Sequence, residues 1–128
     1  MKILLDTHTA LWLVNDYEVL SPSAKSLLLD DANELYISIV SAWEIAIKTS
    51  IGKLSEFSGG VKSFMAKVND MPIQMHLVQT NHVELVESLP FIHRDPFDRM
   101  LVAVAKADGM TILTADENIR KYDVPTAW

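Results

Sequence analysis

Residues 93–105 read HRDPFDRMLVAVA, and they contain the element around which the rest of the chain is interpreted. The segment Met100–Ala105 is apolar on every side, which predicts a buried helix rather than a surface helix. Asp95 suits the N-cap and Pro96 the first helical position, so the start of this helix is well marked. One carboxylate is enough to cap a helix, and Asp98 at the third position needs a further explanation. It either complements the helix dipole, for about 0.3–1 kcal/mol, or it has a chemical role.

The composition is that of a folded protein. The chain has 128 residues, 49% of them hydrophobic, so we expect a single domain over residues 1–128 with a sizeable core. It has no cysteine, which excludes disulfides, thiolate nucleophiles and cysteine-ligated zinc. No apolar run is long enough for a signal peptide or a membrane span, which predicts a cytoplasmic protein without membrane contact. The net charge of −6 argues against a broad basic face but not against acids gathered at a metal site.

Short apolar runs alternate with helical patterns along the chain. This alternation predicts an α/β fold with a parallel sheet covered by helices on both faces. The expected strands are residues 3–5, 35–39, 72–77, 110–114 and, marginally, 124–126. The expected helices are residues 7–14, 21–28, 41–50, 61–68, 83–89, 96–108 and 116–122.

Four acids fall at one edge of this predicted sheet, although they are far apart in the sequence. Ligands gather at the carboxyl ends of parallel strands, and the N-termini of the connecting helices lie along the same edge. Two of the acids follow strands, and two are expected in the first turn of a helix. They are Asp6 and Asp116, then Glu44 and Asp98.

Each acid also has a plain structural explanation. Asp6 and Asp116 are placed to cap the helices that follow them, and Glu44 is placed to pair with Lys48 or to close a capping box with Ser41. If all four acids share one cleft, however, two carboxylates about 4 Å apart repel by roughly 4 kcal/mol at an effective dielectric of 20. Such a cluster needs raised pKa values or a cation. An all-oxygen donor set suits Mg²⁺ or Mn²⁺, and acids around such an ion are typical of nucleases.

The chain resembles PIN-domain ribonucleases, specifically the bacterial toxins of the VapC kind. The matching segments are residues 4–8 (LLDTH), 41–48 (SAWEIAIK), 93–101 (HRDPFDRML) and 113–116 (LTAD). Their order and spacing cover nearly the full length. The resemblance implies a PIN-like three-layer α/β/α sandwich around a parallel sheet of about five strands.

The resemblance also implies an activity and partners. The chain would be a Mg²⁺-dependent endoribonuclease, the toxin of a type II toxin–antitoxin pair, that hydrolyses RNA with a carboxylate-bound metal and an activated water. Asp6, Asp98 and Asp116 would be the nearer metal ligands, and Glu44 would bind a second ion or position the water. A cognate antitoxin and a homodimer are implied as well. The alternative is a non-catalytic PIN-fold module for RNA binding or assembly.

Several neighbours of the acids are candidates for supporting roles. Thr7 and Thr114 are placed to hydrogen-bond the carboxylates or a substrate phosphate. We interpret Asp95 mainly as the cap that fixes the register of Asp98. Four basic residues beside the acids are candidates for contacts with flanking RNA phosphates: Lys48, Lys53, Arg94 and Arg99.

The histidines and tryptophans receive structural interpretations. No two histidines have zinc-ligand spacing, so each is expected in a surface turn or on a helix. The tryptophans are expected to anchor the core or an interface rather than to stack on bases.

Overall fold

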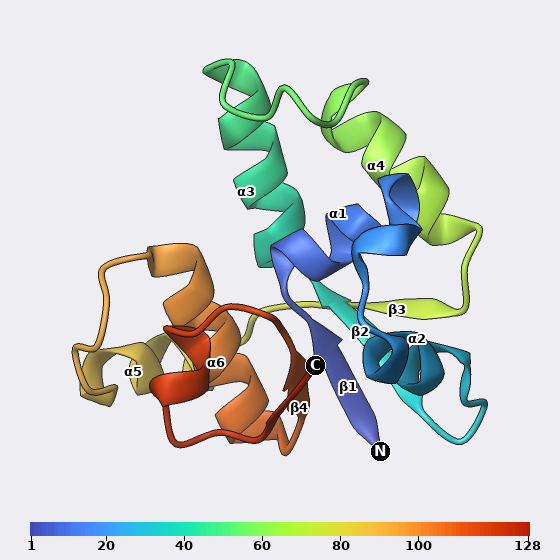
Figure 1. Cartoon of the computed structure of the whole chain (residues 1–128). Helices are drawn as coiled ribbons and strands as arrows, with labels where there is room; N and C mark the ends of the chain where they lie inside the picture. Colours follow the sequence, from blue (N-terminus) through green and yellow to red (C-terminus); the bar gives the residue numbers. More distant parts are fainter.

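Five short strands form one parallel sheet in the computed structural model, which describes all 128 residues. The spatial order is β3-β2-β1-β4-β5, so the first strand lies at the centre (Figure 1). In the central pairings Leu4 is opposite Tyr36 of β2 and Ile112 of β4. The strands are β1 Lys2–Leu5, β2 Glu34–Ser38, β3 Ile73–His76, β4 Thr111–Leu113 and β5 Thr126–Ala127.

Helices cover both faces of this sheet. Ile3 and Leu5 of β1 point into one core, which α1, α2, α3 and α4 cover, whereas Leu4 points into the other core beneath α5 and α6. The predicted three-layer sandwich is therefore confirmed. The helices are α1 Thr7–Asn15, α2 Pro22–Leu29, α3 Ile39–Ser50, α4 Gly60–Asn69, α5 Thr80–Ser88 and α6 Pro96–Asp108, with short 3-10 turns η1 Tyr17–Val19 and η2 Ile119–Lys121.

Helix α6 is the buried helix that the opening stretch predicts. The Asp95 carboxylate accepts hydrogen bonds from the backbone N–H groups of Phe97 and Asp98, and Pro96 occupies the first turn. Residues 101–105 are at most 1% exposed. Gly109 ends the helix at φ 67°, a left-handed conformation that costs glycine little.

Two local predictions were wrong. Helix α3 begins at Ile39 because Ser38, the last residue of β2, caps it by accepting from the Val40 N–H. Glu44 therefore lies in the second helical turn and not in the first. After Thr114 the chain forms only the 3-10 turn η2, since Asp116 accepts hydrogen bonds within a tight turn rather than capping a full helix. No helix in the fold is both long and apolar enough to cross a membrane.

Candidate functional site

Asp6 sits at the end of β1, where the strand turns directly into α1. One carboxylate oxygen accepts from the Thr9 N–H at 2.7 Å, and the other accepts from the Thr114 hydroxyl. Asp6 is 4% exposed. Burial raises its pKa above the ordinary value, and the hydrogen bonds from Thr114 and Thr9 offset only part of that rise. The negatively charged form of the Asp6 carboxylate is therefore less stable here than it would be in water.

Asp98 occupies the first turn of α6, and the charges of all the other acids of the predicted cluster affect its pKa. Its pKa is raised to about 8, first by burial and then by the negative charges of Asp95, Asp116, Glu44 and Asp6. Charges act on one another in this way only at short range, because water and salt screen distant ones. The structure therefore brings the four predicted acids into one electrostatic environment, on the edge expected from the strand order.

Glu44 brings a buried carboxylate to this environment from α3. It is 2% exposed; Oε2 accepts from the Lys48 ammonium at 2.5 Å, whereas Oε1 has no hydrogen-bond partner. Burial disfavours the charge on Lys48, but the carboxylates of Glu44, Asp95 and Asp98 outweigh this effect and raise its pKa. Lys48 thus serves as a counter-charge for Glu44 at one side of the acids.

The donor set fits a hard divalent cation. The proposed ligands are all carboxylates, and one of them, Glu44, has a buried oxygen without a hydrogen-bond partner. The pKa of Asp98 is raised, and a nearby positive charge would lower it. No three of these carboxylates have ligand atoms that all lie within 4.8 Å of one another, and the one group of three residues that meets this spacing is His76, His82 and Asp108. Binding of one ion by three of the acids therefore requires their side chains to move closer together.

Thr114 links two of the acids, as expected for a supporting residue. Its hydroxyl donates to Asp6, and the same oxygen accepts from the Asp116 N–H at 2.9 Å. Thr7 does not contact a carboxylate, because its hydroxyl donates to Ser41 Oγ at 2.9 Å. That bond joins α1 to α3.

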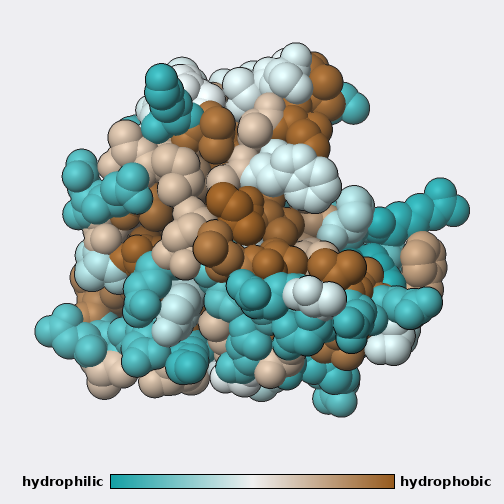
Figure 2. Space-filling view, turned by 180° about the vertical axis from the view of Figure 1, so that it is seen from behind, coloured by the Kyte–Doolittle hydropathy of each residue, from teal (hydrophilic) through white to brown (hydrophobic).

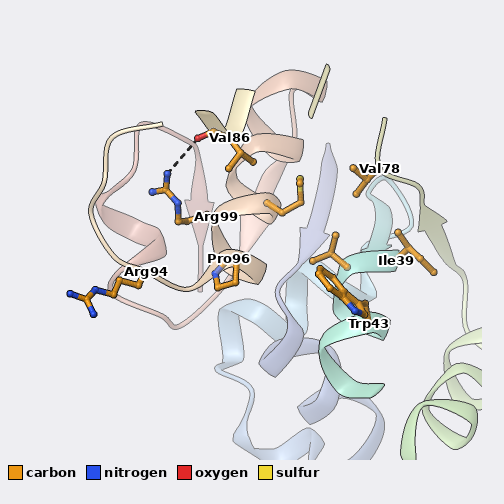
Figure 3. A pocket seen from close by; sticks show the side chains of 9 residues that line it. Ile39, Trp43, Val78, Val86, Arg94, Pro96 and Arg99 are labelled. Atoms are coloured by element: carbon orange, nitrogen blue, oxygen red, sulfur yellow. Dashed lines mark hydrogen bonds between the residues drawn. The ribbon is translucent and has the colours of Figure 1, made fainter. Parts of the chain in front are cut away.

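The expected role of Arg99 is not supported by its surroundings. The side chain is 8% exposed, and its guanidinium donates to the Pro90 carbonyl and the Tyr122 hydroxyl, both at 3.0 Å, and to the Val86 carbonyl at 3.4 Å. These internal acceptors hold the guanidinium inside the fold, so we exclude Arg99 from contacts with RNA phosphates. Arg94, in contrast, is exposed and extends away from its neighbours (Figure 3).

His93 contacts one of the acids, although the sequence suggested only a surface turn or a helix position for each histidine. Nε2 lies 3.2 Å from Asp98 Oδ2, and Nδ1 lies 2.9 Å from the Tyr122 hydroxyl. Because Tyr122 also accepts from Arg99, a continuous polar chain leads from the buried guanidinium to Asp98. The position of His93 five residues before Asp98 was the only signal in the sequence.

His76, His82 and Asp108 form a second polar cluster between β3, α5 and α6. Both Nε2 atoms contact Asp108 Oδ2, at 2.6 Å from His76 and 2.9 Å from His82. The Gln79 N–H donates to His82 Nδ1 at 2.8 Å, so the ring proton is on Nε2 and points at Asp108. A protonated Nε2 cannot ligate a metal, and we interpret the cluster as a structural hydrogen-bond network.

An apolar groove of about 570 Å³ lies between α3 and α6. The view from behind shows apolar surface around a hollow (Figure 2), and the close-up shows Ile39 and Trp43 of α3 on one side of it, with Val86 and Pro96 on the other (Figure 3). Trp43 is 58% exposed and Ile39 is 41% exposed. This much exposed apolar surface is typical of a binding surface.

Comparison with known proteins agrees with this fold. A PIN domain model matches residues 3–125 of the chain. Ribonuclease VapC22 of Mycobacterium tuberculosis (strain ATCC 25618 / H37Rv) is 29% identical over 136 residues, which cover 98% of this chain and 98% of that protein. The chain belongs to the PIN domain family.

Two solved structures share the fold at low sequence identity. The first is VapBC2 from Rickettsia felis bound to a DNA fragment from their promoter, with a TM-score of 0.74, 14% identity and coverage of 99% of this chain and 98% of that one. The second is DNA-bound VapBC from Salmonella typhimurium, with a TM-score of 0.70, 15% identity and coverage of 99% and 97%.

Proposed function

We propose that this PIN domain is a metal-dependent endoribonuclease that hydrolyses RNA phosphodiesters at the edge where Asp6, Glu44, Asp98 and Asp116 meet. The observation that carries the proposal is the convergence of the acids: the Thr114 hydroxyl joins the Asp6 carboxylate to the Asp116 backbone, and the charges of Asp116, Glu44 and Asp6 all raise the pKa of Asp98. Accumulated, unneutralised carboxylates destabilise a fold, and a cation would relieve them. The similarity to a protein named as a ribonuclease supports the same activity.

The proposed ion is Mg²⁺, with Mn²⁺ as a substitute, because every donor is an oxygen. Asp6, Asp98 and Asp116 are the proposed nearer ligands, and Glu44 Oε1 is the free oxygen for a second ion or for the attacking water. When bound, such an ion neutralises the carboxylates and the phosphodiester charge, and it lowers the pKa of a coordinated water.

The protein's own residues hold this arrangement in place. Thr114 and Thr9 fix the orientation of the Asp6 carboxylate through both of its oxygens. Lys48 binds one oxygen of Glu44 and leaves the other one free. His93 restrains Asp98 from the side of Tyr122.

Contacts to the RNA backbone are proposed for Arg94 and Lys53, which are exposed, and for the part-exposed Lys48. Such contacts position a strand without reading its sequence. Neutralising Arg94 and Lys53 together should lower the dependence of RNA binding on salt concentration, because fewer counterions are then released. An unchanged dependence would remove both residues from the proposed interface.

The partner proposal follows from the apolar groove and the VapBC complexes among the similar structures. We propose that an amphipathic helix of a cognate antitoxin fills the groove and directs a basic side chain toward the acids. Ile39→Glu places a charge on the exposed wall, and it should abolish binding of the antitoxin while leaving the thermal melting temperature within a few degrees of the parent. Unchanged antitoxin binding would exclude the groove as the docking surface.

A homodimer and a cytoplasmic location also remain proposals. The sedimentation velocity of the purified chain without antitoxin tests the dimer. Purely monomeric behaviour across the accessible concentration range would contradict it.

Cleavage of labelled RNA by the purified chain tests the proposed activity. We expect cleavage with Mg²⁺, none with EDTA, and none for Asp6→Asn, which keeps the shape of the side chain but removes its charge. Asp31→Asn, at an exposed position, is the matched control and should cleave like the parent. Metal-independent RNA binding without cleavage would instead support the non-catalytic alternative.

A further inference from the structure

A second cavity, of about 220 Å³, opens beside the acids, and its walls differ in chemistry. Asp6 and Asp116 form the acidic side, whereas His8 and Trp12 supply aromatic rings. Ala115 completes the lining and adds no polar side chain. A cavity that joins carboxylates to rings at this position suits a ligand with one charged and one planar apolar part.

The two rings come from the same helix that Asp6 caps. His8 and Trp12 are four residues apart in α1 and therefore lie on one helix face, with ring centroids 5.8 Å apart. His8 is exposed and Trp12 is half-buried. The Trp128 ring contacts Trp12 at 5.6 Å between centroids, so the indole is supported by a neighbouring ring. The rings thus have a fixed place relative to the Asp6 carboxylate.

The chemistry of an RNA strand matches this pair of walls. The phosphodiester carries the charge that a cation at the acids would hold, and the adjacent base is a planar ring that cannot bind carboxylates by charge. Stacking of an unpaired base on an aromatic side chain changes affinity by about 5- to 150-fold per base. A phosphate gains little from the indole face of Trp12, so the base is the part of the strand that fits this wall.

We propose that His8 and Trp12 form a base-binding subsite for one unpaired nucleotide next to the phosphodiester that is cleaved. The subsite rests on the proposed ribonuclease activity and adds to it a contact with the base beside the cleaved bond. It also gives Trp12 a second role beside the core anchor that the sequence predicted. Trp12 packs against the core on one side and borders the cavity on the other.

A comparison of intact and abasic RNA tests the subsite. The probes are a short single-stranded RNA that the parent protein cleaves and the same RNA with one abasic nucleotide, moved through the positions that flank the cut. The variants are Trp12→Leu, Trp12→Phe and His8→Ala. Tyr17→Leu is the matched control, because Tyr17 is another half-buried aromatic residue against the same core but lies outside this cavity.

We expect Trp12→Leu to raise KM for the intact RNA by about 5- to 150-fold with a smaller change in kcat. For the parent protein, removing the base at one position of the RNA should raise KM by a similar factor. With the RNA that is abasic at that position, Trp12→Leu should raise KM no further. Trp12→Phe should restore most of the affinity, and Tyr17→Leu should leave it unchanged. His8→Ala, at an exposed position, should weaken binding without a change in the melting curve, and it keeps the test valid if Trp12→Leu does not fold.

Equal losses on intact and abasic RNA would assign Trp12 a purely structural role and overturn the subsite. Cleavage that does not depend on His8 or Trp12 would overturn the subsite and leave the proposed nuclease standing. Base-dependent binding without cleavage, measured by fluorescence anisotropy of the labelled RNA, would support the subsite and reject the nuclease. Absence of any RNA binding by the parent would overturn both.

Discussion

The hydroxyl of Thr114 donates a hydrogen bond to the carboxylate of Asp6, 108 residues earlier in the chain. The same oxygen accepts from the backbone N–H of Asp116 at 2.9 Å. One buried side chain therefore sets the orientation of one acid and the position of another. It does so across β1 and β4, which are neighbours in the sheet although they lie at opposite ends of the sequence.

Thr114→Val should weaken both the fold and the proposed cation site. Valine keeps the shape but leaves an Asp6 oxygen and the Asp116 N–H without this partner, a loss of about 1–3 kcal/mol in the free energy of unfolding. Mg²⁺ affinity should fall by about 10- to 100-fold, as for other residues that orient metal ligands. Urea denaturation and titration calorimetry measure the two effects. Thr111→Val, on the strand β4 that leads to Thr114 and without a side-chain hydrogen bond, is the control and should stay within about 0.5 kcal/mol.

The raised pKa of Asp98 predicts how the stability of the metal-free protein depends on pH. The folded protein holds a proton on Asp98 up to about pH 8. The unfolded chain loses this proton near an ordinary value of about 3.9. Between these pH values the native state binds more protons, so the free energy of unfolding decreases as pH rises, and the decrease ends above pH 8.

Asp98→Asn should remove this contribution, because the amide does not titrate. Urea unfolding in EDTA, measured at intervals from about pH 5 to pH 8, should show a shallower decrease for the variant than for the parent. Asp31→Asn should follow the parent. Parallel curves for the parent and Asp98→Asn would show that Asp98 is not the titrating group.

Lys48→Met should separate the counter-charge of Glu44 from the proposed cation. Without Mg²⁺ the buried Glu44 carboxylate loses its ionic partner, and the free energy of unfolding should fall by about 1–3 kcal/mol. Mg²⁺ should bind more tightly to the variant, because a competing positive charge has gone. Calorimetry measures the affinity, and Lys53→Met, at an exposed position, is the control. Weaker Mg²⁺ binding by Lys48→Met would mean that Lys48 assists the ion instead of competing with it.

The His76–His82–Asp108 cluster should stabilise the fold without binding zinc. Burial alone would raise the pKa of Asp108, but hydrogen bonds from His82 and His76 lower it overall. A lowered pKa contributes stability at neutral pH that is lost in acid, as the carboxylate becomes protonated below its ordinary value. Asp108→Asn should therefore lower the melting temperature at neutral pH, whereas the exposed Asp70→Asn should not. A Zn²⁺-induced rise in melting temperature that Asp108→Asn abolishes would contradict this structural role.

The sequence predicted those features that depend on local pattern. The apolar run of α6, its Asp95 cap and Gly109 stop were enough to predict a buried helix, and the alternation of strands and helices predicted the sandwich. Strand ends then predicted one edge for Asp6 and Asp116. These inferences succeeded because the spacing of apolar residues and the helix caps depend only on residues that are close together in the sequence.

The missed features depend on contacts between distant residues. Arg99 looked exposed beside Asp98, and only its acceptors at Pro90 and Tyr122 explain why a guanidinium is buried there. His93 likewise joins the site through Tyr122, 29 residues further along the chain. The start of α3 shifted because Ser38 is both the end of a strand and a helix cap. No periodic pattern distinguishes such residues from ordinary surface or turn residues.

The central claim is that the four acids share one divalent cation. Anomalous scattering from a crystal grown with Mn²⁺ tests it most directly, because the signal locates the ion without reference to activity. The account predicts an anomalous peak in contact with the carboxylates of Asp6 and Asp98, with Asp116 and Glu44 alongside. An empty acid edge at saturating Mn²⁺, or a peak only at His76, His82 and Asp108, would contradict it.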